Sequence, residues 1–276
     1  MNYKFTIFTP VYNGELFFQR VFDSLKNQTY RNFEWIIVND GSTDNSDELI
    51  SSLIADVDWN ITYLKQENKG KHIAWNRAVK ISKGDLFIPA DCDDSFLPET
   101  LEFFNAKWNL LPNRNFLSGI NVLCFNVQTK LPIGNLYPKD GFETNNLELA
   151  YKIKPKIEGE KWGCIRLDLL KKIPFPEVTA HFFTESYLWF SLAKNYNVVC
   201  YNKALRGYYK EVTSLTNNVN KRDSNRINMF KVYNIWLISN FGFYLLLNAP
   251  NTLINSFIYI LKSFGLTVAK RLKIIA

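Results

Sequence analysis

A run of carboxylates follows an apolar segment of the chain, since Asp91-Cys92-Asp93-Asp94 comes directly after residues 86–90. Carboxylate oxygens are hard ligands that suit Mg2+ or Mn2+, and a divalent ion held there could bridge two phosphates. An acidic cluster at the end of a strand is also common as a solvated turn or a helix cap. Taken alone, the cluster leaves a metal site and a simple turn both open.

A second polar run, Asp40-Gly41-Ser42-Thr43-Asp44, closes the apolar segment 33–38. As a turn, this run could cap a following helix through a Ser, Thr or Asp side chain. As a binding site, it offers the Asp40 carboxylate to an N–H group of a nucleobase, which needs only a well-placed acceptor.

The spacing of apolar residues predicts the elements that must position these polar runs. Strands are expected at 3–12, 33–38, 61–64 and 86–90, and helices at 15–26, 44–53 and 70–82. Such alternation predicts an α/β fold with a mostly parallel sheet and helices on both faces, where ligands gather at the carboxyl ends of strands. Polar residues lie at the carboxyl ends of all four predicted strands, at 9–13, 40–44, 68–71 and 91–94, so they describe one cleft.

Several of these runs occur together in a fixed order. They are Thr9-Pro10-Val11-Tyr12-Asn13, Gln28-Thr29-Tyr30, Val38 to Asp44, Asn68-Lys69-Gly70, Asn76 and Asp91 to Asp94. As an ordered set, they resemble the family 2 glycosyltransferases. The resemblance implies a Rossmann-like GT-A fold, a nucleotide-sugar donor, a divalent cation (Mn2+ or Mg2+) and inversion at the anomeric carbon.

The resemblance also implies roles for individual residues on the donor side. Donor binding falls to Thr9, Lys71 and Asp91, with Pro10, Tyr12 and Glu15 lining the base pocket and Asp40 on the base itself. Asp93 is the implied metal ligand, Asp91 would face the ribose or the metal, and Asp94 is a second candidate because Asp-x-Asp-Asp fits two registers. Lys71, the implied phosphate contact, is equally consistent with a solvated lysine at a helix start.

Inverting transfer also needs a general base opposite the leaving diphosphate. The family places this base in an acidic pair before a helix, often with a Trp four residues beyond the second acid. The corresponding stretch here is Phe183-Thr184-Glu185-Ser186-Tyr187-Leu188-Trp189. Alignment on Trp189 puts Glu185 at the base position, whereas alignment on the Glu puts Ser186 there. We adopt the Trp189 register because it keeps a carboxylate where the chemistry requires one; a helix-start acid is the alternative.

Two further stretches resemble the acceptor side of the family. Near Leu205-Arg206-Gly207-Tyr208-Tyr209 many members carry a metal-binding His, but the only histidines of this chain are His72 and His181. The metal would therefore rely more on Asp93, phosphate and water. Lys161-Trp162-Gly163 resembles a region that faces the acceptor in a subgroup, so Trp162 could stack on a sugar ring; a core Trp is the other interpretation.

The organisation of the chain follows from these assignments. We expect residues 1–112 to be the nucleotide-sugar-binding half of a GT-A domain, 113–228 the acceptor-binding half, and 229–276 a C-terminal helical extension. The four cysteines are far apart, which argues against zinc and fits a reducing cytoplasm. The N-terminus has no apolar segment of signal-peptide length, so secretion is not expected.

The C-terminal extension combines apolar residues at helical spacing with cations. The apolar residues are Leu253, Ile254, Phe257, Ile258, Leu261, Phe264, Val268, Leu272 and Ile275. Such a helix suits peripheral contact with an anionic membrane, and packing on the catalytic domain or a second subunit is the alternative. No stretch reaches the roughly 20 unbroken apolar residues of a spanning helix. We expect a cytoplasmic protein at the inner face of the cell membrane.

These observations favour an inverting glycosyltransferase of cell-envelope polysaccharide biosynthesis, with a UDP-sugar favoured as donor and a glycan or lipid-linked acceptor; a homo-oligomer stays open. A nucleotidyltransferase would need a Gly-rich basic loop after the first strand, but residues 9–15 contain one Gly and no Lys or Arg. A non-catalytic membrane or carbohydrate-binding protein is disfavoured by the intact acids Asp40, Asp91, Asp93 and Glu185. Lys and Arg form no stripe interleaved with aromatics, which argues against nucleic acid.

Overall fold

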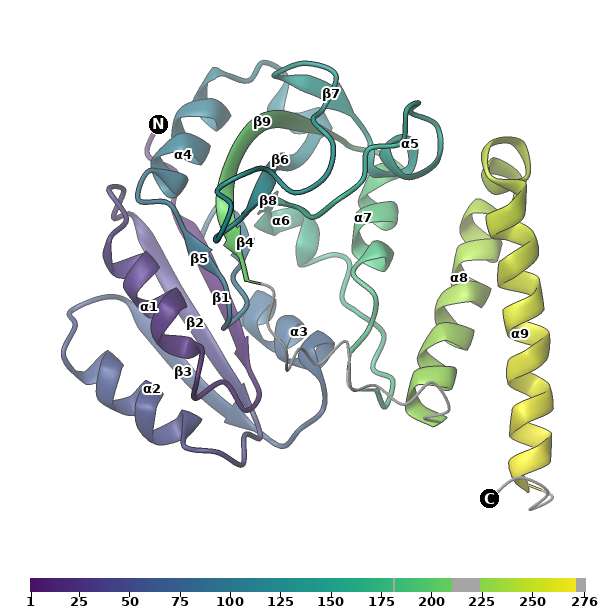
Figure 1. Cartoon of the computed structure of the whole chain (residues 1–276), viewed down its shortest axis with the longest axis horizontal. Helices are drawn as coiled ribbons and strands as arrows, with labels where there is room; N and C mark the ends of the chain where they lie inside the picture. Colours follow the sequence, from purple (N-terminus) through teal and green to yellow (C-terminus); the bar gives the residue numbers. More distant parts are fainter. Residues whose placement is uncertain (181, 210–223, 272–276) are drawn as a thin grey trace.

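A computed structural model describes residues 1–180, 182–209 and 224–271 of the chain (Figure 1). In this part, the strands form one mixed sheet with the order β3-β2-β1-β4-β8-β6-β9-β5, and β7 pairs with β9. The strands are β1 (Phe5–Val11), β2 (Phe33–Asp40), β3 (Ile61–Gln66), β4 (Leu86–Pro89), β5 (Ser95–Phe96), β6 (Leu117–Asn126), β7 (Phe142–Thr144), β8 (Lys161–Arg166) and β9 (Asn197–Tyr208).

The first half of the sheet is parallel, as the alternation predicted. β1 pairs in parallel with β2 and β4, and β2 with β3. Every residue of β2 is buried, because a parallel strand is covered by helices on both faces. The second half is mixed: β8 is antiparallel to β4 and β6, whereas β6 and β9 are parallel with register shifts.

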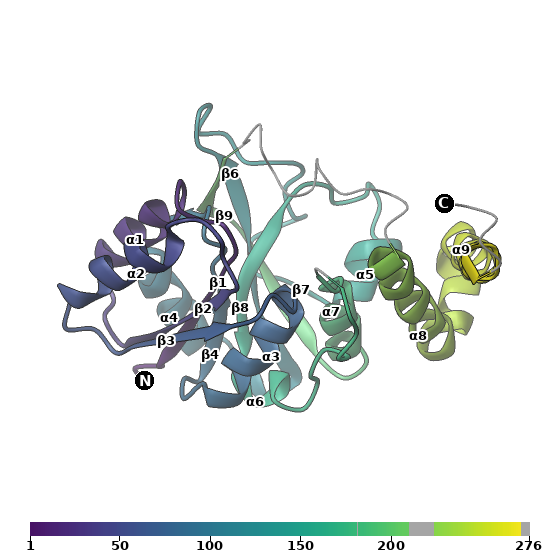
Figure 2. The ribbon, with the colours of Figure 1, turned by 90° about the horizontal axis from the view of Figure 1, so that it is seen from below.

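Helices cover both faces of this sheet (Figure 2). On one face, α1 (Phe18–Lys26), α2 (Ser46–Ala55) and α4 (Thr100–Leu110) pack in the same cluster as Phe5 and Trp35. On the other face, α3 (Lys71–Ile81), α6 (Leu167–Leu170) and α7 (Ser186–Ala193) pack in the same cluster as Phe8 and Ile36. The predicted α/β class is therefore confirmed, although α1 begins three residues later than expected, after a turn in which Phe17 N–H donates to Gly14 O.

The segment from residue 113 to β9 and the C-terminal extension complete the fold. A short 3-10 helix (Arg114–Phe116) precedes β6, and α5 (Asn146–Tyr151) follows β7. Two helices follow β9 in the described part of the chain, α8 (Ser224–Asn248) and α9 (Pro250–Arg271), with Ala249 between them. α8 packs through Leu237, Phe241 and Leu245 on Leu147 of α5 and Phe190 of α7. Among the described helices, none is both long and apolar enough to cross a membrane.

Candidate active site

Three charged side chains from separate elements meet beyond the carboxyl end of β4. Lys71, the first residue of α3, places its Nζ 2.8 Å from Asp91 Oδ1 and 2.9 Å from Glu185 Oε1. Asp91 follows β4 by two residues, and Glu185 is the residue before α7. The three side chains are between 30% and 37% exposed, so solvent and a ligand can reach them. The sequence predicted all three as site residues but not that Lys71 bridges the two acids.

The charges of Lys71 and Asp91 hold each other in their ionised forms. Burial would lower the pKa of Lys71, but Asp91 and Glu185 outweigh it and raise that pKa above its ordinary value. Burial would likewise raise the pKa of Asp91, yet the cations of Lys71 and Arg206 hold it below its ordinary value. Asp91 is therefore a carboxylate at neutral pH, available to a cation or to a hydroxyl group.

Arg206 on β9 positions the acidic turn of residues 91–94. Its Nε–H donates to Asp94 Oδ1 at 2.8 Å, and the Asp94 side chain is 4% exposed. The second oxygen, Asp94 Oδ2, accepts the backbone N–H of Asp91 at 3.1 Å. Because both oxygens of Asp94 are engaged inside the protein, the register that makes Asp94 a metal ligand does not fit this structure. Arg206 lies in a stretch that the sequence flagged only by resemblance, with no indication of its partner.

The remaining carboxylates suit a cation that is shared with substrate. Asp93 is exposed at the tip of the turn, and partial desolvation together with the charge of Asp91 raises the pKa of Asp93. Asp91 Oδ1 is buried and accepts no hydrogen bond, although Lys71 Nζ lies close to it. Mg2+ is commonly held by one or two carboxylates plus substrate phosphates. In the part of the chain that the structure describes, no group of three His, Cys, Asp or Glu residues could hold a metal alone, so the donor set fits a shared ion rather than a protein cage.

Asp40 organises the turn that leads into α3. It is 4% exposed and accepts hydrogen bonds from Gln66 Nε2 at 2.8 Å and from the backbone N–H groups of Lys69 and Gly70, each at 2.9 Å. Gly70 has a φ of 93°, which favours glycine at this position. A carboxylate has about four acceptor positions, so these three bonds leave one position of Asp40 unused. The same three bonds place Lys71 at the site.

The other predicted donor residues divide into surface and core positions. Pro10 and Tyr12 are half-buried at the end of β1, where a base could contact them. Glu15 Oε1 accepts from Asn45 Nδ2 at 2.8 Å, so this carboxylate joins the loop after β1 to the start of α2. Thr9 has no exposed surface, and its hydroxyl accepts from Trp35 Nε1 at 2.9 Å. The prediction that the Thr9 side chain contacts the donor is therefore wrong. Side chains along β1 point alternately to the two faces of the sheet, and that of Thr9 points into the core.

Trp162 is also a core residue, against the prediction that it stacks on an acceptor sugar. Its side chain is 5% exposed, and its ring stacks on Phe96 with centroids 4.9 Å apart. Its Nε1–H donates to the Pro89 carbonyl at 2.6 Å. No face of the ring remains for a sugar, because β8 lies inside the sheet beside β4.

A pair of α3 residues ties the donor side to the segment that carries Glu185. Asn76 Nδ2 donates to Phe175 O at 2.9 Å, and Phe175 N–H donates to Asn76 Oδ1 at 2.8 Å. His72 is buried with its Nε2 2.9 Å from Val178 O, which excludes it as a metal ligand at the carboxylates. His181 lies outside the described residues. Asn76 belongs to the ordered motif set, but the sequence offers no signal for its partner.

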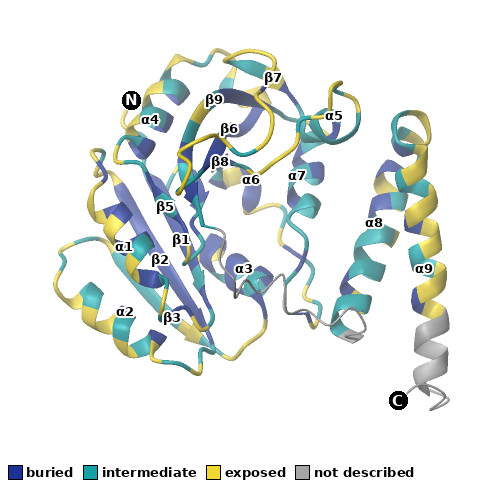
Figure 3. Ribbon diagram, viewed as in Figure 1, coloured by how far each residue is buried: buried dark blue, intermediate teal, exposed yellow. Residues whose placement is uncertain are grey.

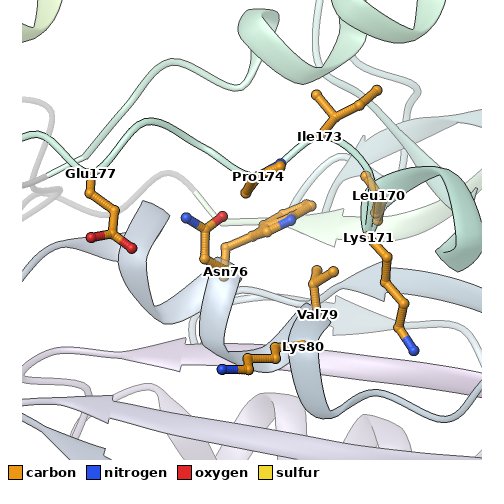
Figure 4. Close-up of a pocket in the computed structure, with 9 residues that line it drawn as sticks. Asn76, Val79, Lys80, Leu170, Lys171, Ile173, Pro174 and Glu177 are labelled. Carbon is orange, nitrogen blue, oxygen red and sulfur yellow. The ribbon is translucent and has the colours of Figure 1, made fainter.

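A cavity of about 420 Å3 lies between α3 and the segment after α6, beside the contact of Asn76 with Phe175 (Figure 4). The residues that line it are Trp75, Asn76, Val79, Lys80, Leu170, Lys171, Ile173, Pro174 and Glu177. Of these, none belongs to the predicted donor, metal or base residues. The cavity is therefore separate from the carboxylate site, which lies at the strand ends.

The sheet order, the helices on both faces and the acidic strand end together define a GT-A glycosyltransferase fold. Residues 6–121 match the family model described as Glycosyl transferase family 2. This match contains strands β2 to β4, all but the first residue of β1, and the acidic turn that follows β4.

Curated relatives match between 38% and 68% of the chain. Glycosyltransferase GlyA of Streptococcus pneumoniae is 40% identical over 104 residues, which are 38% of this chain and 15% of that protein. An uncharacterized glycosyltransferase of Rickettsia typhi is 30% identical over 195 residues, 68% of this chain and 58% of that protein. The teichoic acid poly(glycerol phosphate) polymerase of Staphylococcus epidermidis is 36% identical over 107 residues, 38% of this chain and 15% of the polymerase. The chain thus spans between 15% and 58% of the length of these relatives.

Solved structures share the fold over most of the chain. S. aureus TarS in complex with UDP-GlcNAc has a TM-score of 0.60 at 21% identity, covering 85% of this chain and 66% of that one. Mannosyltransferase PcManGT from Pyrobaculum calidifontis, in complex with GDP-Man and Mn2+, has a TM-score of 0.61 at 19% identity, covering 96% and 76%. At these identities the likeness establishes the fold.

Proposed function

We propose that this protein is an inverting, metal-dependent glycosyltransferase that moves a sugar from a nucleotide diphosphate to an acceptor hydroxyl. The observation that carries the proposal is the Lys71 bridge, which joins Asp91 on the donor side to Glu185 before α7. It sets a carboxylate base across from a strand-end acid at the carboxyl edge of the sheet, where ligands of such sheets bind.

In this mechanism Glu185 accepts the proton of the acceptor hydroxyl. The acceptor oxygen then forms a bond to the anomeric carbon, while the bond from that carbon to the diphosphate oxygen breaks on the opposite side. The nucleoside diphosphate leaves with the electron pair of the broken bond. Lys71 fixes the Glu185 carboxylate and offers a positive charge near the departing phosphates.

The divalent cation, Mn2+ or Mg2+, would be held by Asp93 with Asp91 and would neutralise charge on the diphosphate. Its use is supported by the donor set of the turn and by the Mn2+ in the mannosyltransferase structure. Asp94 and Arg206 position this turn without reaching the ligand. Because the site has two cationic and four acidic side chains, a dication also improves its charge balance.

The finer assignments follow the relatives. We favour a UDP-sugar as donor, since TarS structures contain UDP-GlcNAc or UDP, while the GDP-Man of the mannosyltransferase keeps other bases open. We assign the acceptor to a glycan or lipid-linked precursor of a cell-envelope polysaccharide, which the teichoic acid polymerase supports. We place the reaction at the cytoplasmic face of the cell membrane, where such an acceptor would be presented.

The test is a donor screen of purified protein over a panel of nucleotide sugars with Mn2+, followed by two variants. Glu185→Gln keeps shape and hydrogen bonding but cannot take a proton, so turnover should fall by roughly 100-fold or more with little change in donor affinity. The matched control is Ser186→Ala at the next residue, which should matter much less. Chelator should abolish transfer, and Asp93→Ala should lower it by several orders of magnitude. Equal turnover of Glu185→Gln and wild type would reject Glu185 as the base, and full activity of Asp93→Ala in chelator would reject the metal.

A further inference from the structure

Helix α9 buries serine side chains on one face and exposes apolar side chains on the opposite face, whereas an ordinary surface helix buries its apolar face. Ser256 and Ser263, two turns apart, are 4% and 1% exposed and lie on the side that packs on α8. Five large apolar side chains point outward, although Leu253 and Tyr259 contact α8: Ile254, Phe257, Ile258, Leu261 and Phe264 are between 41% and 70% exposed. They follow the i, i+3, i+4, i+7 spacing of one helix face. We call these five residues the α9 outer face.

The described part of the chain leaves this face uncovered. α8 packs on α5 and α7, and α9 packs on α8, so α9 is the outermost helix (Figures 1 and 3). The part of the C-terminal extension that packs on the rest of the fold is α8. A contiguous apolar surface of this kind on a folded protein marks an interaction site.

The charges around the α9 outer face favour one class of partner. Residues 224–276 contain no Asp or Glu and six Lys or Arg, which is six of the seven net positive charges of the chain. Two of these cations border the face in the structure: Lys262 is exposed beside Leu261, and Lys231 Nζ lies 3.9 Å from the centroid of the Phe264 ring. An apolar stripe bordered by cations complements an anionic lipid surface, in which the rings enter the interface and the ammonium groups meet headgroups.

We propose that the α9 outer face docks on an anionic bilayer as a peripheral contact. A second copy of the chain fits less well, because a symmetric contact would set this acid-free, cationic hairpin against itself. This inference rests on the membrane location given in the proposed function, and it names the α9 outer face as the surface that makes the contact. Lipid binding requires neither donor nor acceptor, so it is measured without substrate.

The experiment is flotation of the full chain with vesicles, in the absence of nucleotide sugar. Phosphatidylcholine vesicles are compared with vesicles that contain about 30% phosphatidylglycerol, at low and high salt. We expect at least about ten-fold more bound protein on the anionic vesicles at low salt, and a loss of most of this difference at high salt. Equal binding to both vesicle types, or no binding to either, would overturn the proposal.

A matched pair of variants locates the contact. Phe257→Glu with Leu261→Glu places two acids in the α9 outer face and should weaken vesicle binding about ten-fold or more. The control is Leu110→Glu with Phe116→Glu, which adds the same charge at two residues that are 75% and 67% exposed on another part of the surface. Equal binding by the two double variants would reject the α9 outer face.

Two further readouts separate the outcomes. If light scattering finds a wild-type dimer that the Phe257→Glu, Leu261→Glu variant converts to a monomer, with no vesicle binding, the face joins two copies and the proposal fails. Transfer to a water-soluble acceptor should be unchanged in this variant, because its residues lie outside the active site. Glu185→Gln, in turn, should float like the wild type, so failure of the proposed chemistry is distinguishable from failure of the membrane contact.

Discussion

Arg206→Met removes the only cation within hydrogen-bonding distance of Asp94 in the described structure and should lower the free energy of unfolding by about 3–5 kcal/mol. The pair is well shielded from water, since the side chains of Arg206 and Asp94 are 13% and 4% exposed. After the substitution, Asp94 keeps one hydrogen bond, from the Asp91 N–H at 3.1 Å. Burial already raises the pKa of Asp94 to about 7 against the lowering effect of Arg206, so without this cation the group must either stay charged with no counter-ion or take up a proton, and both cost free energy.

The same strand supplies a control for this prediction. Lys203, three residues before Arg206 on β9, pairs with Glu99 at 3.2 Å, but these side chains are 47% and 43% exposed. Lys203→Met should therefore change stability by at most about 1 kcal/mol. The contrast between the two substitutions isolates burial, because both replace a cation by methionine on one strand.

Urea and thermal unfolding would measure the difference. For a chain of this size the expected loss for Arg206→Met corresponds to a fall in Tm on the order of 10 °C. Adding Asp94→Asn should recover part of the loss, because the neutral amide oxygen can still accept the Asp91 N–H. Equal midpoints for Arg206→Met and Lys203→Met, or a double variant as unstable as the sum of its parts, would refute the reasoning. Nucleotide affinity should fall along with stability, since Asp94 holds the turn that carries Asp91 and Asp93.

Two other predictions rest on single buried groups. Asp40→Ala removes the acceptor of two backbone N–H groups and should weaken nucleotide binding by about 1–3 kcal/mol in calorimetry; unchanged affinity would remove Asp40 from the site. Burial lowers the pKa of His72 below its ordinary 6.5, so the unfolded chain takes up a proton first as the pH falls. Stability should therefore decrease as the pH falls below about 6.5, and His72→Gln should lose that part of the dependence; identical slopes of unfolding free energy against pH for the two proteins would contradict it.

The donor half of the fold could be predicted because its elements carry local signals. Strands such as β1 and β2 are short apolar runs, α3 repeats buried residues at helical spacing, and polar runs follow the strand ends. The second half could not be predicted to the same extent, because its strands depend on distant partners. β5 has two residues and exists only through its pairing with β9, and β6 meets β9 through register shifts.

For the candidate site, the types of residue could be predicted from the sequence, but their contact partners could not. Asp40 and the acids of 91–94 were singled out by residue type at predicted strand ends, whereas Lys71 and Glu185 were implied by the resemblance to family 2 glycosyltransferases. That Thr9 and Trp162 turn inward, and that Asp94 is neutralised by Arg206, depends on contacts between residues far apart in the chain. Which carboxylate of an Asp-x-Asp-Asp string faces solvent is decided by such a contact and not by spacing.

The tie between α3 and the segment before Glu185 limits how this protein can be recombined with others. Asn76 holds the Phe175 backbone through two hydrogen bonds, and the Phe175 ring packs on His72 and Trp75, so the side chains of α3 are matched to the segment 175–178. A chimera joined at residue 113 would separate the two sides of this match. Exchange of the second half of the chain between relatives therefore calls for α3 to travel with it, although α3 lies in the first half of the sequence.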